Sequence, residues 1–507
     1  MPKIFQYLSI ATFFSLSLFA CEDTLDLEPL NSATPEIFYS DPANFTTGLF
    51  GIYDALQDNG FYGGNVVLDG LSDNAVATDF LDDVLNFAQG NQVNATGSFR
   101  DFYLAPYELI QRSNLLLDNI DVVTGLASDE RALIKAEARA LRAMAYMRLV
   151  YLFGDVPLIT TSLTREEALS ISRNDRNEVI SFVLQEFQEA SSDLGNTSNG
   201  GRLTRQAVLA LRARVMLYEA RLNNQTWGDA LTAINLSIME ADEGGHQLID
   251  NDDPSTDYLS LFLLENEENN EYIFSVAVSP LDSDSRSDFE EFFSWQAGAL
   301  LMYVHQNLAD AYDYADGSAY NPSDTTFLGR DPRLSVNIMH PGQSFAGETY
   351  GVDDSFIKFN GGGTETGLYI YKFSSTDHVE TLNERELNMP VIRYAELLLM
   401  QAEALTETDG NPYPPLNAVR DRAGLPELSG LSQEELRNEI IQERRVELAF
   451  EGLRWFDLMT LGIAEEVING IEETNIIRAF TTGRSELLPI PQTEIGLNPN
   501  LAQNPGY

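Results

Sequence analysis

Two loop segments of the sequence combine aromatic and polar side chains in a way that suits sugar binding. A sugar ring stacks its apolar face on aromatic rings, and its hydroxyl edges bond to carboxylates and amides. The remaining aromatic residues fall mostly on helix-like apolar patterns, so we searched the loops. The segments are residues 61–74 and 292–303, with the candidate ligand contacts Tyr62, Asp69, Asp73 and Asn74 in the first and Phe293, Trp295 and Tyr303 in the second.

Trp295 is the strongest single candidate among these residues. The chain has three tryptophans, and Trp227 and Trp455 both lie in segments whose apolar spacing is typical of core helices. Trp295 lies instead in a segment rich in polar residues. We therefore expect Trp295 to contribute the largest stacking surface of the candidate site.

Catalytic motifs are not found in the sequence. It contains no GxxxxGK[ST] phosphate loop, no GxSxG nucleophile turn and no HExxH metal motif, and its four histidines are not closely paired. Its 78 acidic residues would bring some carboxylates to the 5–9 Å separation of glycosidases by chance. We predict no catalytic residues and no enzyme activity, with a secreted hydrolase as a less favoured alternative.

Neither a cofactor nor a metal ion is predicted. Two acidic loops, Asp282–Ser285 and Asn251–Asp253, offer oxygen ligands of the kind that Ca²⁺ prefers. Neither loop has the spacing of an EF-hand. Solvated acidic loops are the favoured interpretation, and a structural calcium site is the alternative.

The charge of the chain limits its partners. Thirty-one basic residues against 78 acidic ones give a formal net charge of −47. A nucleic-acid-binding protein needs basic residues to replace the counterions of the phosphates, so nucleic acid is excluded as a partner. The same charge favours a neutral glycan over a sulfated or uronic one.

Residues 1–20 are typical of an export signal and not of a membrane span. The uncharged stretch Leu8–Ala20 would rise about 20 Å as a helix, less than the ~30 Å of a bilayer core. It ends at Cys21, the only cysteine, and the arrangement resembles a bacterial lipoprotein signal. We expect Cys21 to be lipidated, residues 21–40 to form a tether, and Glu22 and Asp23 to favour display on the outer leaflet.

The mature chain divides into three parts by composition. Residues 41–240 carry successive helical patterns, and 207–240 resembles a tetratricopeptide hairpin because small residues recur in both of its helices. Residues 241–390 form a loop-rich insert with short β pieces at 272–276 and 369–371 and a helix at 292–313. Residues 391–507 return to helices and end in a docked tail. The fold predicted is mainly α, and the helices expected are 102–121, 129–153, 175–193, 204–222, 392–408 and 432–451.

Four segments in order resemble the SusD/RagB family of outer-membrane nutrient-binding lipoproteins. They are Leu141–Pro157, Arg393–Leu405 with the following 417–425, Ile441–Leu458 and 487–507. The resemblance spreads over essentially the whole mature chain. It implies a mainly α scaffold of four tetratricopeptide-like helix pairs with an irregular insert.

The resemblance also implies a role and partners. Family members act at the cell surface with a SusC-like TonB-dependent outer-membrane transporter, to which they pass captured nutrient. Applied to this chain, this predicts a lipid-anchored, surface-exposed protein that binds an oligo- or polysaccharide. Because some members capture peptides, a peptide receptor remains an alternative. A scaffold that binds protein through its helical groove is another.

Overall fold

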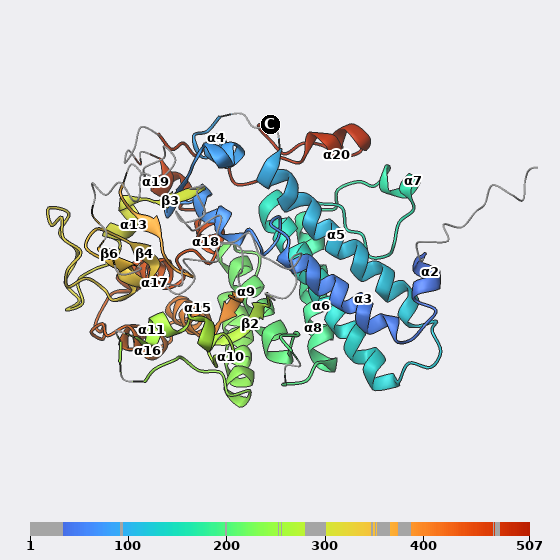
Figure 1. The fold of residues 1–507 in the computed structure, drawn as a ribbon, viewed down its shortest axis with the longest axis horizontal. Helices are drawn as coiled ribbons and strands as arrows, with labels where there is room; N and C mark the ends of the chain where they lie inside the picture. Colours follow the sequence, from blue (N-terminus) through green and yellow to red (C-terminus); the bar gives the residue numbers. More distant parts are fainter. Residues whose placement is uncertain are drawn as a thin grey trace, which may run out of the picture.

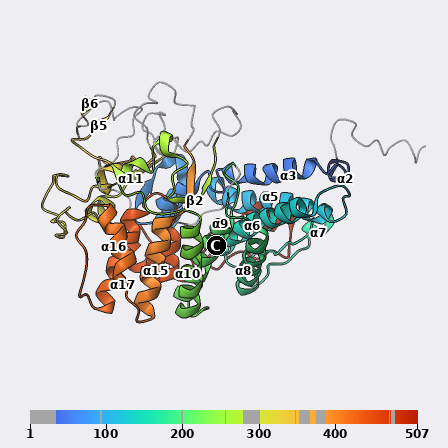
Figure 2. The same ribbon diagram turned by 90° about the horizontal axis from the view of Figure 1, so that it is seen from below.

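A row of packed helices runs through the molecule in the computed structural model (Figures 1 and 2). Each of the first five helices of the row packs against the next, and the sixth, α15, contacts the last two. The structure describes residues 34–91, 95–197, 200–251, 253–254, 256–278, 301–345, 348–349, 351, 366–373, 387–469, 471 and 477–507. The helices of the row are α5 (Gly97–Ile120), α6 (Ser128–Phe153), α8 (Arg176–Asp193), α9 (Arg205–Arg221), α10 (Trp227–Glu243), α15 (Tyr394–Glu407), α16 (Tyr413–Arg422) and α17 (Gln433–Glu447).

These helices confirm the mainly α prediction. The six helices expected from the sequence correspond to α5, α6, α8, α9, α15 and α17. Hydroxyl side chains begin several of them: Thr204 accepts a hydrogen bond from the amide of Ala207 at 3.2 Å, and Ser432 forms a capping box with Glu435. α17 ends at Glu447, four residues earlier than expected, and the chain then turns through Phe450 at φ +63° and Gly452 at φ +72°.

The hairpin of α9 and α10 has the packing that its small residues predict. Ala210, Ala213 and Ala230 are fully buried, so the two helices approach closely without a large side chain between them. Thr226 caps α10 by accepting a hydrogen bond from the amide of Asp229 at 3.1 Å. The tetratricopeptide-like interpretation of this segment is therefore confirmed.

The insert leaves the row after α10 and returns at α15. Strand β2 (Tyr272–Val276) pairs antiparallel with β8 (Met389–Arg393), and this ladder joins the two ends of the insert at its base. The predicted β pieces at 272–276 and 369–371 are thus confirmed, the second as β7. The other insert elements are α11 (Asp257–Ser260), η4 (Leu264–Asn266), β3 (Met302–Val304), α13 (Gln306–Asp310), α14 (Arg333–Asn337), β4 (Ile338–Met339), β5 (Ser344–Phe345), β6 (Glu348–Thr349) and β7 (Tyr369–Ile370).

The helix predicted at 292–313 is wrong over its described part. Residues 302–304 form β3, which pairs antiparallel with β1 (Ala75–Ala77) in the N-terminal part, and only 306–310 are helical. The apolar spacing of this segment fits a helix, but pairing with a strand more than 200 residues away decides its conformation.

The C-terminal end of the chain packs onto the row. The side-chain amide of Asn504, near the C-terminus, donates to the carbonyl of Phe153 at 3.0 Å and to that of Leu488 at 2.7 Å. This contact docks the tail at the end of α6. The remaining elements are α2 (Pro35–Phe38), α3 (Asn44–Asp54), η1 (Ala55–Gln57), η2 (Asn65–Leu71), η3 (Asp79–Leu81), α4 (Asp82–Ala88), α7 (Arg165–Ala168), α18 (Arg454–Leu461), α19 (Ala464–Ile468) and α20 (Gln492–Leu497).

A fully buried carboxylate, Glu447 at the end of α17, joins the insert to the helical row. It accepts from Arg422 at 2.5 Å, from Arg333 at 3.0 Å and from Arg393 at 3.1 Å. Arg393 and Arg422 also share Glu271, which precedes β2. Burial alone would raise the pKa of Glu447, but the three guanidinium groups outweigh it and hold the pKa well below its usual range.

Lys372, in the insert, caps the C-terminal end of α17. Its ammonium group donates to the carbonyl of Ala449 at 3.0 Å, to that of Glu447 at 3.2 Å and to the carboxylate of Glu451 at 2.7 Å. Carbonyls at the end of a helix have no partners within the helix, so a buried cation there satisfies them. Burial lowers the pKa of Lys372 to about 8 despite Glu451.

Replacing Glu447 by Gln should lower the free energy of unfolding by about 3–5 kcal/mol, because three buried arginines would lose a shared counter-charge. Urea denaturation measures the loss. The matched control is Glu407→Gln, which breaks an ion pair to the half-exposed Arg437 and should cost about 0–1 kcal/mol. Equal losses in the two variants would contradict the role assigned to Glu447.

Candidate functional site

The first candidate segment lies inside the protein. Asp73 is fully buried, and its carboxylate accepts from Arg454 at 2.8 and 2.9 Å and pairs with Arg445 at 3.0 Å. Burial alone would raise the pKa of Asp73, but Arg445 and Arg454 outweigh it and lower the pKa. Both arginines come from the C-terminal part of the chain, so Asp73 fixes the N-terminal segment to α17 and α18.

Asp69 and Asn74 extend this clamp. Asn74 donates to Asp69 at 2.8 Å and accepts from Arg445 at 3.0 Å, and the backbone amide of Gly452 donates to Asp69 at 3.1 Å. Burial raises the pKa of Asp69 to about 7 against these two donors. A side chain at position 452 would collide with Asn65, so the close approach of the two segments requires the glycine.

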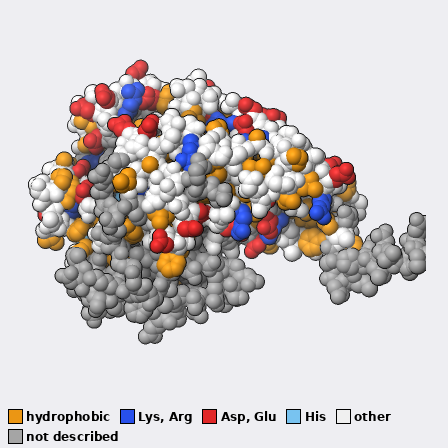
Figure 3. Space-filling view, turned by 90° about the horizontal axis from the view of Figure 1, so that it is seen from above, with side chains coloured by type: hydrophobic (Ala, Val, Ile, Leu, Met, Phe, Trp, Pro, Cys, Tyr) orange, Lys and Arg blue, Asp and Glu red, His pale blue; other side chains and the backbone are white. Residues whose placement is uncertain are grey.

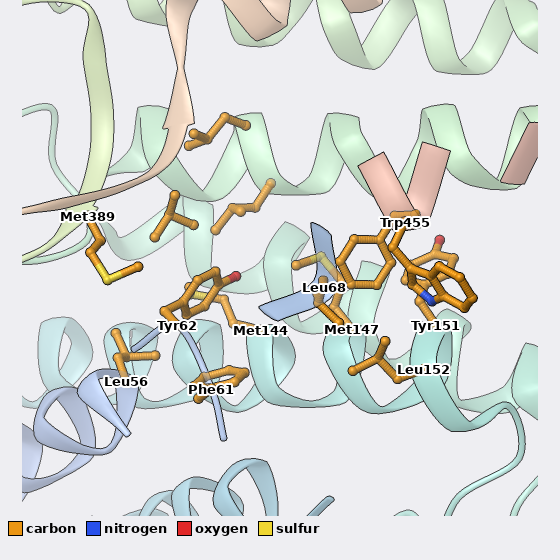
Figure 4. Packing of buried hydrophobic residues seen from close by; sticks show 14 of the residues in the cluster. Leu56, Phe61, Tyr62, Leu68, Met144, Met147, Tyr151, Leu152, Met389 and Trp455 are labelled. Atoms are coloured by element: carbon orange, nitrogen blue, oxygen red, sulfur yellow. The ribbon is translucent and has the colours of Figure 1, made fainter. Parts of the chain in front are cut away.

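Tyr62 belongs to the core. Figure 4 shows its ring among Leu56, Phe61 and Met144, and it is 6% exposed. Its centroid lies 4.8 Å from that of Phe61, and the guanidinium carbon of Arg148 lies 5.8 Å away. The ring of Tyr62 is therefore packed among core side chains.

The ligand contacts predicted for Tyr62, Asp69, Asp73 and Asn74 therefore need a correction. All four side chains are less than one-tenth exposed, and the carboxylates and the amide have partners inside the protein. In this structure they position the segment from residue 61 to 77 and do not line an open surface. The physical reason is the set of arginines from the C-terminal part, which draws the acidic side chains inward.

The second candidate segment is described only in part. Tyr303 lies on β3 opposite Val76 and is 5% exposed, so its ring is inside the protein. Phe293 and Trp295 lie outside the described residues, as does Cys21. The β1–β3 ladder pairs Tyr303, in the described end of the second candidate segment, with Val76, which follows the clamp of Asp73.

An exposed aromatic side chain, Phe80, lies just beyond the β1–β3 ladder. The amide of Thr78 donates to the carbonyl of Leu301 at 2.9 Å, which continues the β1–β3 ladder to the edge of the described residues. Two residues later, Phe80 is 68% exposed. Among the described aromatic residues only Phe50 and Phe80 are more than one-third exposed, and Phe50, on α3, partly covers Arg202 at 5.9 Å.

Polar side chains flank Phe80. Asp79 and Asp82 are exposed, and the amide of Asn86 bonds to the carbonyl of Asp82 at 2.6 Å. We name Thr78, Asp79, Phe80, Asp82 and Asn86 the β1–α4 surface. The sequence interpretation missed Phe80, although an aromatic residue between two acidic ones after a strand could have indicated it.

A cavity of about 490 Å³ lies elsewhere, between α5, the chain around α7 and α20. Its polar side chains largely serve the fold: Asn114 donates to the carbonyls of Ile159 and Thr161, and Asn498 donates to that of Ile171. Figure 1 places α7 and α20 on the side of the helical row, away from β3. The cavity is therefore separate from the β1–α4 surface.

Acidic side chains are spread over the visible face of Figure 3 and do not form a single patch. Within the described ranges no three His, Cys, Asp or Glu side chains are grouped to hold a metal ion. In the loop at Asn251, the carboxylate of Asp257 accepts from the amides of Asn251 and Asp253 at 2.9 and 3.1 Å. Backbone amides of that loop thus already bond to the nearby carboxylate. The other loop proposed for calcium, 282–285, lies outside the described residues.

None of the described helices is long and apolar enough to span a membrane. The fold defines a class of protein: a row of tetratricopeptide-like helix pairs that carries a loop-rich insert.

Two family profiles match the chain. One is described as the SusD family, over residues 270–507, and the other as "Starch-binding associating with outer membrane", over 23–217.

Individual proteins of the same kind match over nearly the whole chain. SusD-like protein P25 of Formosa agariphila is 27% identical over 99% of each chain. The solved structure of a SusD-like carbohydrate binding protein from Bacteroides fragilis is 26% identical with a TM-score of 0.81, over 92% of this chain and 100% of that one. A laminarin binding SusD-like protein is 26% identical with a TM-score of 0.73, over 92% and 99%. The chain belongs to the SusD/RagB family.

Breaking the clamp of Asp73 should loosen the strand that carries the β1–α4 surface. We expect Asp73→Asn to increase amide hydrogen exchange in residues 75–80 by at least tenfold, because two buried arginines lose their carboxylate. Mass spectrometry of deuterium uptake measures this. The exposed neighbour Asp79→Asn is the control and should leave exchange unchanged; equal protection in both variants would show that the clamp does not position the strand.

Proposed function

We propose that the protein captures oligosaccharides on the β1–α4 surface together with the segment that contains Phe293 and Trp295, and that it binds them without chemical change. The family membership supports this proposal. So do the solved relatives of at least 25% identity whose names specify carbohydrate and laminarin binding. The observation that carries it is the exposure of Phe80 just beyond the β1–β3 ladder.

The physical chemistry of the surface suits a sugar. An exposed phenyl ring gives a sugar a face for stacking, and the neighbouring carboxylates and amide accept and donate the hydrogen bonds of its hydroxyl groups. Hydrogen bonds exchanged with water contribute little net free energy, so stacking should dominate the affinity. Because Asp79 and Asp82 are both acidic, a neutral glycan suits the surface better than an anionic one.

We further propose that Cys21 carries the lipid that holds the protein on the outer face of the outer membrane, beside a SusC-like TonB-dependent transporter. The family description "associating with outer membrane" supports the location. The lipoprotein-like signal before Cys21 supports the anchor. A tether of polar residues would let the captured glycan be passed to the transporter.

Removing either aromatic side chain should weaken glycan binding. With the chain from residue 22 onward, which includes every described element, we expect Phe80→Ala and Trp295→Ala each to reduce affinity about tenfold or more, roughly the loss of one stacking contact. Affinity electrophoresis against neutral and acidic polysaccharides, including laminarin, measures it. The glycan recovered afterwards should be unchanged in length.

Phe50→Ala is the matched control, because Phe50 is also exposed but lies on α3. It should migrate as the unaltered protein does. Retardation that persists in both Phe80→Ala and Trp295→Ala would place the glycan elsewhere. Binding to peptides with no retardation by any glycan would favour the peptide-receptor alternative.

Cys21→Ala should abolish both lipid incorporation and membrane association, because Cys21 is the only thiol that an acyl-transfer step could use. Radiolabelled palmitate and cell fractionation measure this. The anchored chain, cross-linked in cells and purified, should carry a TonB-dependent transporter. Unchanged labelling in the variant, or an anchored chain that carries no transporter, would refute the corresponding part of the proposal.

A further inference from the structure

Arg148, on α6, is a buried cation with no carboxylate partner. It is 4% exposed, and none of the ion pairs formed by the described residues includes it. Its Nη1 donates to the side-chain oxygen of Asn65 at 2.7 Å, but its Nε and Nη2 have no hydrogen-bond partner. On the same helix, Arg142 donates to Glu186 through Nε and Nη2 at 3.1 and 2.6 Å, so an unpaired guanidinium is not a general property of α6.

Aromatic rings compensate for this charge only in part. The guanidinium carbon lies 5.2 Å from the ring centroid of Phe102, 5.6 Å from that of Phe61 and 5.8 Å from that of Tyr62. Ring faces attract a cation, but they do not replace the in-plane acceptors that guanidinium N–H groups need. Burial lowers the pKa of Arg148 to about 10, because its charge is removed from water.

A small cavity of about 30 Å³ lies beside this group. Every lining side chain is at most 9% exposed, so the cavity is lined by buried residues throughout. About 10–15 Å³ of such space holds one water-sized particle. The hydroxyl of Tyr218, which also lines the cavity, has no hydrogen-bond partner either.

Apart from the hydroxyl of Tyr62, the other polar groups of the lining have partners already. Asn65 donates to the carbonyl of Glu451 at 2.6 Å and accepts from Arg148, and Tyr151 donates to Glu219 at 2.7 Å. Arg214 pairs with Glu396 at 2.5 Å. The groups left unpaired are therefore N–H and O–H donors beside one uncompensated positive charge. A water molecule would find only phenolic oxygens for its own hydrogens, whereas an anion needs donors alone.

We propose that this cavity is a binding site for a single monovalent anion of halide size, chloride in the protein's normal surroundings. The anion accepts from the free Nε–H and Nη2–H of Arg148 and from the hydroxyl of Tyr218, and it neutralises the buried guanidinium. It thereby stabilises the junction of α6, α9 and the segment around Asn65. The site shares no residue with the β1–α4 surface.

Chloride should therefore raise the thermal stability of the chain from residue 22 onward. At fixed total ionic strength, with sodium gluconate replaced by sodium chloride, we expect the unfolding midpoint to rise linearly with the logarithm of chloride concentration once the site fills. Fixed ionic strength removes the general screening of surface charge, which chloride and gluconate share. Crystals soaked in bromide should show one anomalous peak within hydrogen-bond distance of Arg148 and Tyr218.

Variants separate the site from general stability. Arg148→Met should lose the chloride dependence, and Tyr218→Phe, which keeps the guanidinium, should reduce it. Arg142→Met is the control: it breaks a buried ion pair and lowers the midpoint, but the chloride dependence should persist. The proposal would be overturned if the unaltered chain had the same unfolding midpoint in chloride and in gluconate. It would also be overturned if bromide-soaked crystals showed a water in the cavity and no anomalous peak. Both results are informative even if Arg148→Met fails to fold.

Discussion

The carboxylate of Glu447 is the contact on which the arrangement of the insert depends. It is fully buried and lies between arginines from β8, α14 and α16, so three parts of the chain meet on one side chain. A buried ion pair of this kind stabilises a protein little relative to an apolar core. Removing one partner, however, leaves the others buried without a counter-charge. The network therefore specifies which segments meet more than it adds stability, and it fixes the loop-rich insert to a rigid helix end.

The same helix end positions the N-terminal segment. Arg445, in the last turn of α17, and Arg454, at the start of α18, both hold Asp73. The last turn of α17 thus holds the insert through Glu447 and the segment from residue 61 to 77 through Arg445. The β1–β3 ladder then joins them directly. Phe80 is exposed just beyond the ladder, whereas residues 75–77 before it are buried.

The sequence predicted most of the helical row, because apolar spacing, small residues and hydroxyl caps are local signals. It was wrong at 302–304, where a strand from the N-terminal part provides the partner and no local pattern reports it. For the candidate site it predicted that side chains of residues 61–74 face a ligand, whereas the structure places them inside the protein. Acidic and aromatic residues in a glycine-rich segment suit a surface as well as a core, and only arginines about 370 residues away decide between them.

The buried arginines have a consequence for the outside of the molecule. Among the described residues fourteen of the chain's 31 basic side chains are buried, against only sixteen of its 78 acidic ones. Within the described part of the chain the buried charges nearly cancel, so its net negative charge lies away from the core, with few cations left to offset it. Two such molecules repel one another at low ionic strength, which keeps a crowded layer of them apart, and polyanions would approach only when divalent cations screen the field.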